Sequence, residues 1–359
     1  MNSRDRVIAA MEHREPDILP MQDGMWASTV NSWYAQGLPR NVKWGSPEDY
    51  SVTEYFGFDI ARFGIDLSAR FPGKVIETGK EHTVEITRDG SVIKKMKDSL
   101  SSAILVKNAI NDRKDWEKFK TRLQPDADRI DAKAGNLENF KKAKQENKFT
   151  VLYAQTGIDR CQLFMKSEEL LVLMLDNPDL AKDMFKTVAQ LVLESCKLLR
   201  QKGYAFDGLW ICNDMGYKNA SLISPALYRE LILESDKQLF DYAHLNGMKV
   251  VQHSCGYVGE LIPNLIEAGV DCLHPLEVKA GMDLVKLKKM YKGKLAFMGG
   301  IEASKINNPA EIEREISEKL RVAMPGGGYI YHSDHSIPPS VEFKNYLYAL
   351  ETVRKHGKY

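Results

Sequence analysis

Residues 250–256 read Val-Val-Gln-His-Ser-Cys-Gly, a short apolar run that ends in a histidine and a cysteine two positions apart. Alternate residues of a strand point to the same side, so a strand ending here would present His253 and Cys255 together. Imidazole nitrogen and thiolate sulfur are ligands that zinc prefers, and a catalytic zinc site needs three protein ligands and an open position. The pair alone is weak evidence for a metal site, because a free cysteine more often serves as a small apolar side chain.

Seven other apolar runs resemble this one in length and are bounded by turn residues, which predicts eight strands in all. The predicted strands are residues 18–22, 58–65, 149–155, 208–212, 248–253, 270–275, 295–299 and 329–332. Amphipathic stretches with a helical period separate the later strands, which predicts helices over residues 224–244, 258–268, 283–291 and 309–323. Ser224 and Pro225 are typical of a capped helix start.

Strands that alternate with helices favour a parallel sheet with right-handed crossovers. Eight of them in 359 residues predict an α/β fold, a (β/α)8 TIM barrel that forms a single domain over residues 1–359. A doubly wound open sheet is the alternative, but no Gly-x-Gly-x-x-Gly motif follows the first strand. Around Asp89-Gly90 the alternating segments predict a small β-hairpin, followed by a charged helical segment over 113–147. We therefore expect an insertion over about 70–147, after the second strand.

The composition indicates a cytoplasmic protein that binds neither nucleic acid nor membranes. The 50 basic and 49 acidic residues give a net charge of +1, which provides no general attraction to nucleic acid or an anionic membrane. The chain has no apolar run near the ~20 residues that span a bilayer, and no secretory signal at its N-terminus. Its five cysteines, an odd number without a pattern, favour a reducing compartment.

In a barrel of this class the chemistry lies at the C-terminal ends of the strands. The predicted ends of the fifth, sixth and eighth strands carry four side chains that could bind one metal ion: His253, Cys255, Glu277 and His335. Nitrogen, sulfur and oxygen ligands together suit zinc better than magnesium or calcium. The alternative is that the histidines are bonded to carboxylates at the barrel mouth, that Cys255 packs in the core, and that Glu277 pairs with a lysine.

The chain also resembles the uroporphyrinogen decarboxylase superfamily. The opening residues 3–17 (Ser-Arg-Asp-Arg-Val-Ile-Ala-Ala-Met-Glu-His-Arg-Glu-Pro-Asp) carry the resemblance, and residues 251–256, 298–302 and 326–339 continue it. True decarboxylases of this superfamily have an arginine-rich N-terminal segment that binds the many carboxylates of the substrate. The matching residues 19–26 contain no arginine, which argues against decarboxylation of uroporphyrinogen.

A second branch of the superfamily consists of zinc-dependent methyltransferases that exchange methyl groups with a corrinoid protein. It includes methylcobamide:coenzyme M methyltransferases and the substrate-side enzymes of O-demethylase systems. Its motif is His-x-Cys-Gly, an acidic residue about two dozen positions later, and a last ligand after the final strand. His253, Cys255 and Glu277 match this motif, whereas His335 stands where the coenzyme M branch usually has cysteine. This difference argues against an enzyme that alkylates a thiol.

The resemblance implies a corrinoid-dependent methyltransferase that moves a methyl group from a small methylated substrate, such as an aryl methyl ether, to the cobalt of a corrinoid (cobalamin) on a partner protein. Zinc would stabilise the charge that develops on the ether oxygen. Asp214, Glu277 and Asp334 are the catalytic candidates. The substrate-binding candidates are Trp26, Tyr153, Trp210, Asn213 and Met215. The alternatives are a methylcobamide-to-thiol methyltransferase, a decarboxylase of a smaller acid, and a non-catalytic corrinoid- or tetrapyrrole-binding protein.

Overall fold

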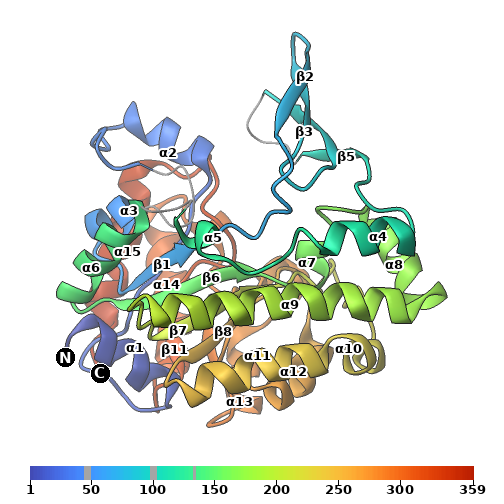
Figure 1. The fold of residues 1–359 in the computed structure, drawn as a ribbon. Helices are drawn as coiled ribbons and strands as arrows, with labels where there is room; N and C mark the ends of the chain where they lie inside the picture. Colours follow the sequence, from blue (N-terminus) through green and yellow to red (C-terminus); the bar gives the residue numbers. More distant parts are fainter. Residues whose placement is uncertain (44–49, 98–102, 132–134) are drawn as a thin grey trace.

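The structure is a computed structural model that describes residues 1–43, 50–97, 103–131 and 135–359. Its centre is a curled sheet of seven parallel strands whose order in the sheet follows their order in the chain, β1-β6-β7-β8-β9-β10-β11 (Figure 1). The strands are β1 (Ile60–Gly64), β6 (Phe149–Gln155), β7 (Gly208–Cys212), β8 (Lys249–His253), β9 (Cys272–His274), β10 (Ala296–Met298) and β11 (Tyr329–Ile330).

Helices connect the strands and cover the outside of the sheet, as expected for parallel neighbours. The α-helices are α1 (Ser3–Met11), α2 (Ala27–Tyr34), α3 (Tyr50–Phe56), α4 (Arg113–Lys120), α5 (Ala127–Asp131), α6 (Gly135–Gln145), α7 (Gly157–Cys161), α8 (Ser167–Asp176), α9 (Pro178–Gln201), α10 (Pro225–Leu231), α11 (Leu233–Leu245), α12 (Ile262–Ala268), α13 (Leu284–Met290), α14 (Pro309–Ala323) and α15 (Phe343–His356). Short 3-10 turns η1 (Gly259–Leu261), η2 (Val278–Ala280) and η3 (Ala303–Lys305) follow β8, β9 and β10.

Two helix predictions need correction. The helix predicted over 224–244 is two helices, α10 and α11, which meet at Ile232. The charged segment predicted over 113–147 forms α4, α5 and α6, and part of it, residues 132–134, lies outside the described residues. The predicted cap is confirmed, because the Ser224 side chain accepts a hydrogen bond from the Leu227 amide and Pro225 is the first helical residue.

The prediction of a first strand over residues 18–22 is wrong, because this segment does not form a regular strand. Met21 forms an isolated parallel bridge with Tyr331, and the Gln22 amide donates to the Tyr331 carbonyl at 3.0 Å. On the other side, the Asp59 amide donates to the Met21 carbonyl at 2.8 Å. Pro20 has no amide hydrogen, so the segment cannot build a continuous hydrogen-bond ladder. Residues 18–22 therefore lie between β11 and β1 without forming a strand.

An antiparallel sheet of four strands projects from the body of the protein in Figure 1. It consists of β2 (Lys74–Thr78), β3 (His82–Ile86), β4 (Val92–Met96) and β5 (Ile104–Lys107), in that order. The predicted turn at Asp89-Gly90 joins β3 and β4, and Gly90 has a φ of +79°. The predicted hairpin is therefore part of a larger sheet, which we call the arm.

Two apolar layers hold the central sheet. One lies between the sheet and the outer helices, and the other fills the inside of the curled sheet. The inner layer takes alternate residues from the strands, and α1 adds Val7, Ala10 and Met11 to it. In β8 this alternation places Val251 in the inner layer and His253, two residues later, above it. The C-terminal ends of the strands therefore project polar side chains just above an apolar floor.

Candidate metal centre

The candidate metal centre lies where the loops after β7 and β8 come into close contact. Gly256 follows Cys255 with a φ of +76°, and a Cβ atom there would lie 2.5 Å from the carbonyl carbon of Gly216. A Cβ on Gly216 would lie 2.3 Å from the carbonyl oxygen of Cys255. Tyr217 and Tyr257 form an antiparallel bridge immediately beyond these glycines. The two glycines therefore let the loops after β7 and β8 pack backbone to backbone, which brings Asp214 next to Cys255.

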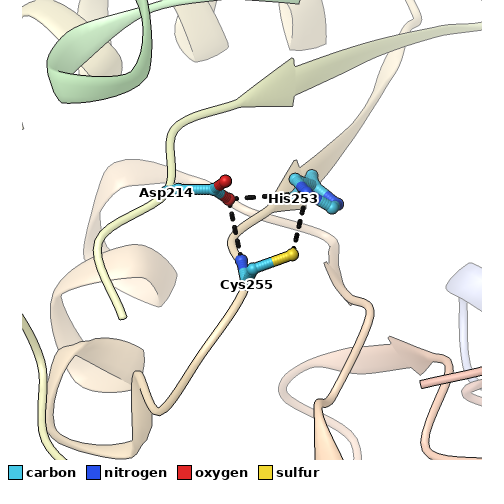
Figure 2. Close-up of side chains that lie close together, drawn as sticks. All are labelled: Asp214, His253 and Cys255. Carbon is cyan, nitrogen blue, oxygen red and sulfur yellow. Dashed lines mark hydrogen bonds and ion pairs between the residues drawn. The ribbon is translucent and has the colours of Figure 1, made fainter. Parts of the chain in front are cut away.

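Figure 2 shows the three side chains that meet there, Asp214, His253 and Cys255. The Cys255 sulfur lies 3.5 Å from Nε2 of His253, and the same nitrogen lies 3.4 Å from Oδ1 of Asp214. The Asp214 carboxylate also accepts a hydrogen bond from the Cys255 amide at 2.8 Å. The three ligand atoms lie within 4.8 Å of one another, and the described part of the chain holds no second group of this kind.

Burial keeps the histidine and the cysteine of this group neutral. Burial raises the pKa of the Cys255 thiol, and the nearby carboxylates of Asp214 and Glu277 raise it further. Burial also lowers the pKa of His253, although the Asp214 charge opposes that shift. A bound cation would instead favour the thiolate form of Cys255, because metal ligation replaces the proton of a cysteine. The group thus offers nitrogen, sulfur and oxygen donors to one cation.

Two further histidines lie behind His253. Nδ1 of His253 is 2.7 Å from Nδ1 of His274, and the His274 ring packs at 4.3 Å, edge to face, against His332. Nδ1 of His332 donates to the Ser333 carbonyl at 2.7 Å and lies 3.5 Å from Asp23. Burial lowers the pKa of His274, and that of His332 to about 3. Both side chains are therefore neutral; His274 contacts His253, and His332 packs against His274.

A cavity of about 270 Å³ adjoins the group. It is lined by Gly24, Trp26, Arg62, Tyr153, Trp210, Cys212, Asp214, His253, Cys255, His274, Pro275, His332, His335 and Ser336. A larger cavity of about 660 Å³ lies elsewhere, between α14 and the C-terminal residues 356–359, but it contains none of the metal-binding candidates. The smaller cavity is therefore the candidate active site.

The structure brings most of the predicted site residues to this cavity. Trp26, Tyr153 and Trp210 line it, as do Asp214, His253, Cys255 and His335. The ring of His335 stacks on Trp26 at 5.6 Å and is not part of the three-residue group. Glu277 is also outside the group: it accepts a hydrogen bond from the Gly256 amide at 2.8 Å and lines a neighbouring cavity that shares Cys255.

Besides Glu277, three predicted residues do not line the cavity. The side-chain oxygen of Asn213 accepts a hydrogen bond from the Ile158 amide at 2.9 Å, and Met215 is fully buried. Asp334 accepts hydrogen bonds from the amides of Val278 at 3.1 Å and Ala303 at 2.9 Å. Its carboxylate therefore ties together the loops after β9, β10 and β11.

Sequence reasoning missed seven cavity residues, namely Gly24, Arg62, Cys212, His274, Pro275, His332 and Ser336. Arg62 had a recognisable signal, because it is the one charged residue within the apolar strand β1 and shares the inward face with Ile60. A charge at an inward strand position is costly unless the site uses it. Cys212, His274 and His332 are not part of the His-x-Cys motif. Their place at the cavity follows only from the way the strands pack.

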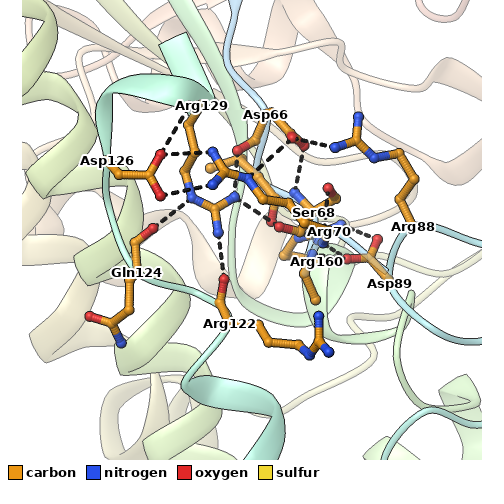
Figure 3. Close-up of polar contacts among 12 residues, drawn as sticks. Asp66, Ser68, Arg70, Arg88, Asp89, Arg122, Gln124, Asp126, Arg129 and Arg160 are labelled. Atoms are coloured by element: carbon orange, nitrogen blue, oxygen red, sulfur yellow. Dashed lines mark hydrogen bonds and ion pairs between the residues drawn. The ribbon is translucent and has the colours of Figure 1, made fainter. Parts of the chain in front are cut away.

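A second cluster of charged side chains lies beneath the arm (Figure 3) and has a structural role. Arg129 is fully buried and donates to the backbone carbonyls of Gln124, Asp66, Ser68 and Arg122 at 2.6–2.8 Å. Arg160 pairs with Asp89 in the turn between β3 and β4. The Arg160–Asp89 pair ties the arm to the body, whereas Arg129 joins the segments on either side of the arm.

Comparisons with known proteins agree with this architecture. Residues 106–356 match the uroporphyrinogen decarboxylase (URO-D) family, and the chain belongs to that family. Its fold is similar to that of a methyltransferase from Methanosarcina mazei, with a TM-score of 0.70 and 15% sequence identity over 99% of this chain and 98% of that chain. No curated protein matches the sequence.

Two other solved structures are less similar. A Bacteroidetes-affiliated GH5 cellulase gives a TM-score of 0.47 and 11% identity, covering 98% of this chain and 93% of that chain. A B12-independent methionine synthase from Shewanella sp. W3-18-1 gives a TM-score of 0.40 and 10% identity, covering 84% of this chain and 83% of that chain. Among the described helices, none combines the length and apolar character needed to cross a membrane.

Proposed function

We propose that the protein is a zinc-dependent methyltransferase that moves a methyl group from a small methylated substrate, an aryl methyl ether, to the cobalt of a corrinoid on a partner protein. The observation that carries the proposal is the Asp214–His253–Cys255 group beside a cavity with aromatic walls. Membership of the URO-D family and the likeness in fold to the Methanosarcina mazei methyltransferase support it.

The donor set of this group fits zinc, which accepts nitrogen, sulfur and carboxylate oxygen together. We propose Asp214, His253 and Cys255 as protein ligands, because their ligand atoms already lie within 4.8 Å of one another. Glu277 and His335 are candidates for a fourth ligand, since both lie beside the group. Zinc bound there would supply a Lewis acid that weakens the carbon–oxygen bond of an ether.

The remaining cavity residues would hold the substrate. Trp26, Tyr153 and Trp210 provide flat apolar surfaces on which an aromatic ring can pack. Burial raises the pKa of Tyr153, so its hydroxyl stays protonated beside the thiol of Cys212. In the reaction the methyl–oxygen bond breaks and oxygen keeps the electron pair. The methyl carbon bonds to cobalt(I), which supplies both electrons of the new bond, and the oxygen then takes one proton from water.

Asp214 and Asp334 have different parts in this proposal. Asp214 lines the cavity and holds the Cys255 amide, so besides ligation it can orient the substrate oxygen. Asp334 is a positioning residue, because it bonds the amide of Val278, the residue after Glu277, and precedes His335. We further propose that residues 18–22 complete a (β/α)8 barrel, since they bond to Tyr331 on one side and Asp59 on the other.

The test is methyl transfer to free cob(I)alamin at high concentration, with a panel of methoxylated aromatic compounds and zinc-loaded protein. We expect the absorption spectrum of methylcobalamin to appear together with one equivalent of the demethylated phenol. Cys255→Ser, which keeps the size of the side chain but weakens zinc ligation, should abolish both products. Formation of neither product by the native protein, with free cobalamin or with a corrinoid protein encoded nearby, would contradict the proposal.

A decarboxylase of a smaller acid is the second candidate, and one observation favours it. Arg62 lines the cavity and could bind an acid, although the N-terminal segment 19–26 has no arginine. Release of carbon dioxide by protein freed of zinc with a chelator, unaffected by Cys255→Ser, would favour this reaction over methyl transfer.

A further inference from the structure

The arm is a sheet that the rest of the described chain leaves uncovered. Every residue of its strands β2, β3, β4 and β5 is exposed or half-buried. Each strand nevertheless carries apolar side chains, among them Val84, Val92 and Ile104. A sheet normally buries at least one apolar face against another layer of the protein. Apolar surface left open in this way marks a place where a partner binds.

The hydrogen-bond register sorts the side chains of the arm into two faces, because residues level with one another in a sheet point to the same side. One face, which we call the lysine face, consists of three rows: Lys74, Ile86, Val92 and Lys107; Glu77, Val84, Lys94 and Ile104; His82 and Met96. The opposite face consists of Val75, Thr78, Thr83, Glu85, Ile93, Lys95 and Leu105. Neighbours such as Lys94 and Lys95 therefore belong to different faces.

The edges of the arm are poorly suited to pairing with a strand of another chain. Ile76 in β2 and Val106 in β5 have no partner in the register, so both edge strands bulge at these residues. Bulges in edge strands hinder the addition of a further strand. The faces of the arm are therefore the surfaces open to a partner.

The lysine face combines apolar side chains with positive charge. The ammonium groups of Lys74, Lys94 and Lys107 form no ion pair with a described residue. The one carboxylate of this face, that of Glu77, lies 3.2 Å from the ring of His82. Two copies of the chain packed through this face would bring like charges together, whereas an acidic partner surface would neutralise them. The face thus fits an apolar partner surface with acidic side chains around it.

The arm leaves the body at the edge of the sheet that carries the candidate active site. β1 ends at Gly64, and residues 65–73 lead directly into the arm. Asp89, in the turn between β3 and β4, pairs with Arg160 of α7, which begins two residues after β6 ends. Because the strands of the curled sheet are parallel, the ends of β1 and β6 lie at the same edge as the metal-binding candidates.

The acceptor of the proposed reaction needs a docking surface at this edge. A cavity of about 270 Å³ suits a small methylated substrate, but a corrin ring with its side chains is far larger. The cobalt therefore has to approach the methyl group from outside the cavity, held by its carrier protein. A carrier in that position lies over the cavity and beside the base of the arm.

We propose, building on the methyltransferase function above, that the lysine face of the arm is the docking surface for the corrinoid protein. The matching surface of the corrinoid protein is then an apolar patch with acidic side chains around it. Ile104 packs against the apolar patch, and Lys94 and Lys107 pair with the carboxylates. The arm determines how tightly the carrier binds and has no part in the chemical step.

The test compares two acceptors, free cob(I)alamin and the corrinoid protein encoded nearby. Binding of the corrinoid protein to zinc-loaded enzyme is also measured by biolayer interferometry without a methyl donor. Lys94→Glu and Ile104→Glu change the lysine face, and Lys95→Glu and Val75→Glu are the matched changes on the opposite face. The Ile104 and Val75 side chains are 59% and 50% exposed, so neither change disturbs a core.

We expect Lys94→Glu and Ile104→Glu each to weaken binding of the corrinoid protein about tenfold or more, and to lower kcat/KM for it by the same factor. Transfer to free cob(I)alamin should stay within about twofold of the native rate, because no docking surface is involved. Lys95→Glu and Val75→Glu should leave both acceptors unaffected. Thermal unfolding of each variant checks the fold.

Four results would overturn the proposal. The native protein does not bind the corrinoid protein, or folded Lys94→Glu and Ile104→Glu bind it as tightly as the native protein does. Alternatively, analytical ultracentrifugation finds a native dimer that Ile104→Glu dissociates, which would assign the lysine face to a second copy of the chain. Lastly, phosphatidylglycerol vesicles bind the native protein but not Lys94→Glu, which would assign the face to a membrane.

The outcomes also separate this inference from the proposed function. Binding of the corrinoid protein that depends on Lys94 and Ile104, without methyl transfer to either acceptor, would support the docking surface and refute the methyltransferase. Methyl transfer to both acceptors at the native rate in all four variants would do the opposite.

Discussion

The Nδ1 atoms of His253 and His274 lie 2.7 Å apart, so one of the two rings must donate a proton to the other. Nε2 of His253 faces Cys255 and Asp214, and it can bind a metal only through a free lone pair. The arrangement that permits metal binding therefore has the proton of His253 on Nδ1 and His274 as the acceptor. A contact of this kind orients a ligand ring and raises its basicity.

We expect His274→Phe to lower the affinity for zinc by about tenfold to a hundredfold, because His253 loses the acceptor that selects its tautomer. Competition with a chromophoric chelator measures the change. His244→Phe is the control, since His244 bonds Asp271 and does not line the cavity. Equal zinc affinity in both variants would show that His274 does not support the centre.

Gly256 allows the close contact between the two loops of the centre. Gly256→Ala should cost about 3 kcal/mol or more in the free energy of unfolding, because a Cβ at a positive φ would also lie 2.5 Å from the Gly216 backbone. Gly247→Ala has a similar φ of +73° with no atom within 4 Å, so it should cost only about 1–2 kcal/mol. Urea unfolding gives both values, and similar losses would mean that the loops can separate freely.

Arg129 joins the segments on either side of the arm. Arg129→Met leaves one buried and three partly buried backbone carbonyls without their donor, which should cost about 3 kcal/mol. The arm should also become more sensitive to limited proteolysis. In Arg88→Met only an exposed arginine and its ion pair with Asp66 are lost, so we expect less than about 1 kcal/mol. An unchanged cleavage rate in Arg129→Met would show that Arg129 does not hold these segments together.

The buried carboxyl group of Asp236 should make the stability of the protein depend on pH. Burial raises its pKa to about 7, and the Tyr228 hydroxyl donates to it at 2.8 Å. Between the ordinary carboxyl pKa of about 4 and this value, the folded state holds a proton that the unfolded state has lost, so Asp236 lowers stability as the pH rises. Asp236→Asn removes this ionisation. Its stability relative to the native protein should therefore increase, by a few kcal/mol in order of magnitude, between pH 4 and pH 8.

Urea unfolding across that pH range measures the effect. Asp241→Asn changes an exposed carboxylate on the same helix and should run parallel to the native protein. If the Asp236→Asn curve is also parallel, the carboxyl of Asp236 does not titrate in this range.

The sequence predicted the regular elements best where a continuous pattern ends at a clear signal. The bounds of β6, β7 and α14 agree with prediction to the residue, and Asn308 caps α14 as its position before Pro309 suggests. The pattern failed at residues 18–22, which are apolar but contain Pro20. It also missed β5, whose four residues are too few to display a period.

The site was predictable only in part, because residues next to each other after a strand end point in different directions. Asn213, Asp214 and Met215 are consecutive, and of the three only Asp214 lines the cavity. The motif found His253 and Cys255 because two-residue spacing keeps side chains on one face. Arg62 comes from β1, far from the motif in the sequence, and His274 comes from β9, the strand after β8; the curled sheet brings both to the same cavity.

The most direct test of the metal centre is the zinc content of the purified protein by elemental analysis. We expect about one zinc per chain in the native protein, as for a single catalytic site. His253→Ala and Cys255→Ala should each lose that zinc, whereas Cys196→Ala, which changes a buried cysteine of α9, should keep it. Full zinc content in both His253→Ala and Cys255→Ala, with the fold intact, would contradict a zinc centre at this site.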